Sequence, residues 1–192
     1  MSSFLARRIE TLSDIIFAVA MTEPIYSLPF PDRAGPVTGL MPLLRPMLWP
    51  GFALGVSFLF SGIFWFSHHR RLTHTSANSR RYLFVTFAFL FLIVLLPVPT
   101  ILYGRYGAIP SIAAFFSGYL ALIATVNAAL WLEAIAKLPS RPWRMVAGPG
   151  VLAGVFLLAA LVSLRDPALG SALWLATALA PVADAIATRV PL

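Results

Sequence analysis

The chain has 192 residues, of which 59% are hydrophobic and only 11% are charged, and it contains no cysteine. This composition excludes an ordinary soluble domain, and the missing cysteines exclude a disulfide scaffold and a thiolate metal site. The net charge of +7 is spread in short clusters between apolar blocks, which is typical of loops facing anionic lipid and argues against a nucleic-acid-binding surface.

Six segments are apolar and long enough to cross a bilayer, which takes roughly 17–25 residues. We predict an all-α membrane protein with spans near residues 8–28, 46–67, 82–103, 109–133, 145–164 and 168–188. Polar or Pro/Gly-rich connections separate them, at residues 29–42, 68–81, 103–107, 137–143 and 165–167. We expect residues 1–192 to form a single six-span domain.

The basic residues predict the orientation of these spans. Ten of the 14 lysines and arginines fall on one side: at the N-terminus, in the 68–81 connection, in the 137–143 connection with the adjacent Arg144, and in the C-terminal tail. This bias predicts that both termini lie in the cytoplasm.

The first predicted span carries two carboxylates, Asp14 and Glu23, and is broken by Pro24. Ionisable groups inside a membrane are costly, so they face protein or water. For Asp14 two readings stay open, a packing network with Arg8 and Ser13 near the cytoplasmic interface or direct contact with a permeant ion. Pro24 predicts that the regular helix stops near Thr22.

The second span ends with Trp65 and His68, which lie one helical turn apart and so share a face. We expect His68 to form a structural hydrogen bond, to Asp14 or Ser13, in preference to binding a metal. We find no nucleophile motif, Gly-rich phosphate loop or paired carboxylates, and we therefore expect no enzyme activity, no cofactor and no metal site.

Arg8-Ile-Glu-Thr-Leu12-Ser13-Asp14 resembles the Arg-x-x-x-Phe-Ser-Asp signature of the transmembrane protein 175 family of bacterial and lysosomal potassium channels. The stretch "IIFAVAMT" at 15–22, the Trp65 and His68 pair and "LLPVPTILYGRYG" at 95–107 are similar to that family as well. The resemblance implies a homotetramer of six-helix subunits in the lipid bilayer, with the first helices lining a central pore for potassium or other monovalent cations and no carbonyl filter.

On this resemblance the family's pore positions fall on Val19, Thr22, Glu23 and Tyr26. Leucine or isoleucine is usual where Glu23 stands. Four Glu23 carboxylates around an axis would form a cation-binding ring, or Glu23 would lie in a wet extracellular mouth; both readings stay open. Arg8, Ser13, Asp14, Trp65 and His68 would hold the first helix against its neighbours.

Two other functions stay open from the sequence. One is a proton-coupled membrane transporter with Asp14 or Glu23 as the relay. The other is a non-conducting structural membrane protein, because the pore face departs from the family pattern.

Overall fold

The computed structural model describes residues 2–29, 39–74, 80–136 and 143–178, and every regular element within these ranges is a helix. The helices are listed here in chain order: α1 (Ser2–Thr22), η1 (Glu23–Ser27), α2 (Leu40–Leu44), η2 (Arg45–Met47), α3 (Leu48–His74), α4 (Arg80–Leu95), α5 (Pro97–Tyr106), α6 (Pro110–Ile135), α7 (Arg144–Ser163), α8 (Pro167–Ala172) and η3 (Leu173–Ala178). The all-α prediction is confirmed for this part of the chain.

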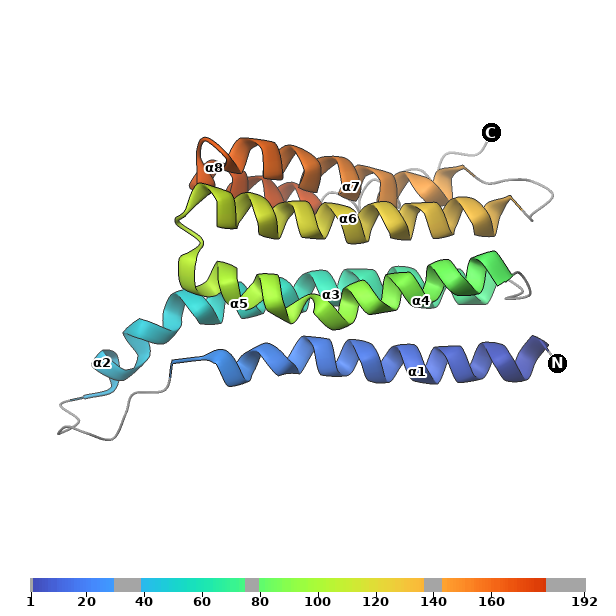
Figure 1. Ribbon diagram of the computed structural model, residues 1–192, viewed down its shortest axis with the longest axis horizontal. Helices are drawn as coiled ribbons and strands as arrows, with labels where there is room; N and C mark the ends of the chain where they lie inside the picture. The colour runs from blue at the N-terminus through green and yellow to red at the C-terminus, as the bar shows by residue number, and fades with distance from the viewer. Residues whose placement is uncertain (1, 30–38, 75–79, 137–142, 179–192) are drawn as a thin grey trace.

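The long helices lie side by side in a bundle (Figure 1). The first helix, α1, forms one side, where it packs against α3 and α4, while α6 and α7 pack together on the opposite side. The N-terminus of α1 lies at the same end of the bundle as the C-terminal end of α3 and the start of α4, and the short α2 and α8 lie at the other end. The start of α1, the end of α3 and the start of α4, all of which are rich in arginine, thereby share one end of the molecule.

Four stretches of the described chain are long and apolar enough to cross a membrane: Leu40–Leu72, Arg80–Tyr106, Pro110–Ile135 and Arg144–Ser163. They contain the second to fifth predicted spans to within one residue. The first predicted span corresponds to α1 with η1, whose charged side chains set it apart from the other four. The sixth corresponds to α8 and η3 up to Ala178, and its remaining residues lie outside the described part of the chain.

Two predicted boundaries are wrong. Residues 68–74 belong to α3, not to a polar loop, because Arg71 is fully buried and hydrogen-bonded inside the bundle. Residues 103–106 belong to α5, not to a turn, because the ring of Tyr103 is packed in the core. Charge and glycine content alone suggested connections where tertiary packing continues the helix.

Aromatic side chains fill the centre of the bundle. Phe60 of α3 meets Phe156 of α7 edge-on, with ring centroids 4.8 Å apart. Trp174 of η3 lies against Phe116 of α6 and Tyr103 of α5, with centroid distances of 5.2 and 5.1 Å. These contacts join η3 to α5 and α6 and give the long helices one shared core.

Candidate functional site

The helix α1 has two chemically different faces. One face is buried against the rest of the chain and includes Ser13, Phe17 and Ala20, with Phe17 only 1% exposed. The other face is exposed and mixes polar residues such as Thr11 and Thr22 with large apolar ones, Ile15 at 58% and Val19 at 57%. Positions that recur every three to four residues share a helix face, so α1 packs on its own subunit with one side and offers the other to a different surface.

Ser13 and His68 join the buried face of α1 to α3. His68 Nε2 lies 2.9 Å from Ser13 Oγ, and Ser13 Oγ donates its own proton to the carbonyl oxygen of Ile9 at 2.7 Å. A hydroxyl has one proton, so His68 must donate from Nε2. Its Nδ1 then accepts from Nη2 of Arg71 at 2.6 Å. A neutral His68 with the proton on Nε2 satisfies all of these bonds.

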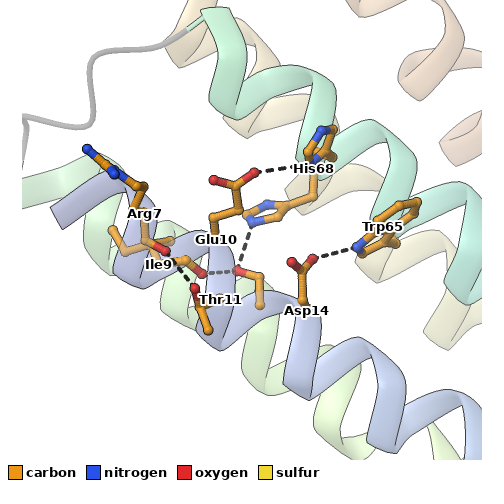
Figure 2. A network of polar contacts seen from close by, with 9 residues as sticks. Arg7, Ile9, Glu10, Thr11, Asp14, Trp65 and His68 are labelled. Carbon is orange, nitrogen blue, oxygen red and sulfur yellow. Dashed lines mark hydrogen bonds and ion pairs between the residues drawn. The ribbon is translucent and has the colours of Figure 1, made fainter. Parts of the chain in front are cut away.

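A second contact between the same helices lies one residue further along α1. Trp65 Nε1 donates to Asp14 Oδ1 at 2.8 Å, and the carboxylate of Glu10 lies 3.5 Å from Nδ1 of His69 (Figure 2). The rings of Trp65 and His69 stack with centroids 5.7 Å apart. Asp14 therefore has a donor on α3, which accounts for a carboxylate in the first predicted span.

Arg71 extends this network to the far side of the bundle. It is 0% exposed, donates from Nη1 to Asn127 Oδ1 of α6 at 2.7 Å and from Nε to the hydroxyl of Tyr82 of α4 at 3.2 Å. Asn127 in turn donates to Ser67 Oγ of α3 at 2.9 Å. A hydrogen-bonded path thus runs from α1 through α3 to α6.

The sequence reasoning missed Arg71 and Asn127 as members of this network. Arg71 was counted among the loop cations, although it follows His68 by one helical turn. Asn127 can be recognised from the sequence as a member of a polar contact, because an amide in an otherwise apolar span needs a hydrogen-bond partner inside the protein. Arg8, the remaining residue assigned to the network, lies exposed on α1.

The residues assigned to the pore lie toward the other end of α1. Thr22 is the last residue of α1, as Pro24 predicts, and its hydroxyl donates back to the carbonyl oxygens of Ala18 at 2.9 Å and Val19 at 3.2 Å. The residues after it, Glu23–Ser27, form the 3₁₀-helix η1. Proline at its start is compatible with that helix, since its fixed φ suits a first turn.

Glu23 and Tyr26 are both exposed on η1, Tyr26 at 86%. Residues three apart eclipse in a 3₁₀-helix, so the two side chains share a face. Val19, Thr22, Glu23 and Tyr26 therefore form an exposed strip along the end of α1 and η1. This strip is separate from the Ser13–His68 contact, which lies about 14 Å back along the helix from Thr22 at 1.5 Å per residue.

Among the described residues, no group of three or more His, Cys, Asp or Glu side chains could hold a metal ion. Glu10 and His69 come close together, but they supply only two ligands. Structural and catalytic sites for transition metals take at least three protein ligands.

The first half of the chain matches a known family model. Residues 8–97, which include most of α1 and all of α3 and α4, match the family model described as the endosomal/lysosomal potassium channel TMEM175. The chain is 33% identical over 129 residues to a potassium channel of Streptomyces collinus and 30% identical over 132 residues to a potassium channel of Chamaesiphon minutus. These matches cover 65% and 66% of this chain and 62% and 64% of the two relatives, less than two thirds of their length.

The fold matches over a longer range. The crystal structure of a lysosomal potassium-selective channel TMEM175 homologue from Chamaesiphon minutus superposes with a TM-score of 0.80 at 24% identity. The superposition covers 96% of this chain and 98% of that one. The four apolar stretches make this a multi-pass membrane protein, and the resemblance noted at Arg8–Asp14 is confirmed by the match of residues 8–97 to the TMEM175 family model.

Proposed function

We propose that this chain is the subunit of a passive cation channel that conducts potassium, with four copies around a central pore lined by α1. In this proposal residues 1–192 form one six-span channel domain in the bacterial inner membrane, with both termini in the cytoplasm. The names of the relatives and of the family model support conduction of potassium. The opposite characters of the two faces of α1 support its place at the pore.

The exposed face of α1 is the observation that carries the proposal. The helix α1 lies on the outside of the subunit, with Phe17 buried and Val19 more than half exposed. It can therefore present Val19 to other subunits or to the pore axis. In the proposed tetramer, four Val19 side chains form an apolar constriction. Ions pass this constriction when it is wide enough to hold water, and they are blocked when it loses its water.

Thr22, Glu23 and Tyr26 supply the polar chemistry beyond that constriction. The proton of the Thr22 hydroxyl is used on the helix carbonyls, which leaves oxygen lone pairs for a cation. Four Glu23 carboxylates would attract cations and repel anions. Tyr26, on the same face of η1, would line the opening on that side.

The contacts of α1 with α3 would hold the pore helix in place. Ser13 bonded to His68 and Asp14 bonded to Trp65 fix the rotation of α1 about its own axis. A rotation of α1 by one residue, about 100°, would break both bonds and would turn Val19 away from its position. Arg8 is assigned to the same positioning role.

Liposome flux measurements with potassium, sodium and caesium test the proposal. Val19→Ala should raise the flux and weaken discrimination among the three ions, because it widens the constriction. The matched control is Val98→Ala on α5, since Val98 is 54% exposed and Val19 is 57% exposed. Equal flux from the two variants would refute the pore position of Val19.

The same assay separates the alternatives. Saturable uptake driven by a proton gradient would identify a transporter, and no flux from well-folded protein would identify a structural protein.

Glu23→Gln should reduce cation flux at low ionic strength and have less effect at high salt, because surface charge is screened within about 10 Å at 0.1 M salt. An unchanged flux at low salt would place Glu23 away from the ion path.

Asp14→Ala tests the positioning role. It removes the acceptor for Trp65, so α1 should become less firmly held, and flux or oligomer assembly should change while the protein still reaches the membrane. Asp14→Asn keeps an acceptor oxygen and should behave more like the wild type. Wild-type selectivity and assembly in Asp14→Ala would contradict this role.

A further inference from the structure

A cavity of about 680 Å³ lies at the end of the bundle opposite the N-terminus. Three segments far apart in the sequence form its walls. They are the end of η1 with the two residues after it, the start of α3 with Pro46 of η2, and the C-terminal end of α5. The lining residues are Tyr26, Ser27, Leu28, Pro29, Pro46, Trp49, Pro50, Gly104, Arg105 and Tyr106.

Among the described residues that line the cavity, Arg105 carries the one formal charge, and none is an aspartate or glutamate. A cationic ligand would therefore meet an uncompensated positive charge, whereas an anion would be attracted. The guanidinium presents several N–H donors in a plane, which matches the oxygens of a phosphate. Charge and donor geometry both favour a phosphate group.

The remaining walls are aromatic and apolar. Trp49 is stacked on Phe52 and donates from Nε1 to the carbonyl oxygen of Tyr103 at 3.3 Å, so its ring is held in place at the start of α3. Tryptophan and tyrosine at the ends of membrane helices lie at the level of lipid headgroups. The cavity volume falls within the range of small-molecule sites, about 300–1,000 Å³.

We propose that this cavity binds the headgroup of an anionic phospholipid, with the phosphate on Arg105 and the glycerol region against Trp49 and Tyr106. The inference goes beyond ion conduction and does not depend on it, because binding can be measured with no ion gradient. Since Tyr26, Ser27 and Leu28 form one wall, a bound headgroup would brace η1 against α3 and α5.

Photo-crosslinking in bilayers tests the site. The full-length protein is placed in nanodiscs that contain a trace of phosphatidylglycerol with a photoreactive group next to the headgroup, and the crosslinked peptides are mapped by mass spectrometry. We expect crosslinks in residues 26–29, 46–50 and 104–106. Arg105→Gln should lower their yield roughly tenfold, the effect of losing a hydrogen bond to a charged group, and Arg105→Lys should keep most of it.

Arg165→Gln is the matched control. Arg165 is an exposed arginine in the turn between α7 and α8, at the same end of the bundle but outside the cavity (Figure 1). It should leave the three crosslinked segments unchanged. The proposal is overturned if Arg105→Gln crosslinks as the wild type does, or if Arg165→Gln reduces the yield equally, which would indicate general attraction of anionic lipid to a basic surface.

Two further arms identify the source of the phosphate. Competition by millimolar inorganic phosphate, with loss of the crosslinks, supports a site that takes the free anion as well as the lipid. Crosslinks that persist in inorganic phosphate but are lost on adding excess unlabelled phosphatidylglycerol support a site that needs the lipid. If excess unlabelled phosphatidylglycerol fails to compete, the proposal is refuted.

Discussion

Replacing Asn127 with alanine should destabilise the protein more than its small change in volume suggests. Asn127 is 2% exposed and accepts the bond from Arg71 Nη1 at 2.7 Å. Loss of a hydrogen bond to a charged group costs roughly 1.5–3 kcal/mol. The second bond, from Asn127 Nδ2 to Ser67 Oγ at 2.9 Å, adds about 0.6 kcal/mol, the average for neutral interhelical bonds in membranes.

The free energy of unfolding should therefore fall by about 2–4 kcal/mol in Asn127→Ala, as the sum of these two terms. It can be measured by titrating the protein in mild detergent micelles with a denaturing detergent and following the loss of helix. Asn127→Asp keeps an acceptor for Arg71 and should lose less. Thr125→Ala on the same helix is the control, because within the described part of the chain the Thr125 hydroxyl bonds to the backbone oxygen of Ala121 and to no other helix.

Two results would refute this reasoning. The first is a free energy of unfolding for Asn127→Ala within about 0.5 kcal/mol of the wild-type value, which is the range of neutral surface substitutions. The bond to Arg71 would then not contribute to the stability of the bundle. If Asn127→Asp is as destabilising as Asn127→Ala, the loss comes from packing and not from the acceptor.

Two more substitutions test the turn between α7 and α8. Gly170→Ala should lower the melting temperature in detergent, because the added Cβ would meet Ser163 Oγ and would lie 2.9 Å from the backbone oxygen of Ala159. Overpacking of this kind costs about 1–3 kcal/mol. Gly154→Ala is the control and should leave the melting temperature unchanged, because its added Cβ would have no atom within 4 Å. Asp166→Ala should cost about 1 kcal/mol by removing the N-cap bond to the Leu169 amide, and Asp166→Asn should restore most of it, measured in the same melts. Equal melting of the two glycine variants, or of Asp166→Ala and wild type, would contradict these accounts.

The sequence by itself determined the features that depend on neighbouring residues. Long apolar blocks predict membrane helices, because backbone polar groups in lipid must be paired within the segment. Pro24 predicts the end of α1 at Thr22, since proline lacks a backbone donor. The order Arg8, Ser13 and Asp14 indicated the resemblance to the family, and the positions that this resemblance assigns to the pore, Val19, Glu23 and Tyr26, are all exposed.

Only the tertiary structure decided which distant groups meet. Nothing local pairs Arg71 with Asn127, 56 residues away, or moves Arg71 from a loop into the core. The cavity beside η1 likewise exists only because three separate segments converge at one end of the bundle. Partners of buried polar groups and the shapes of cavities follow from how the helices pack, and single-residue properties do not encode that packing.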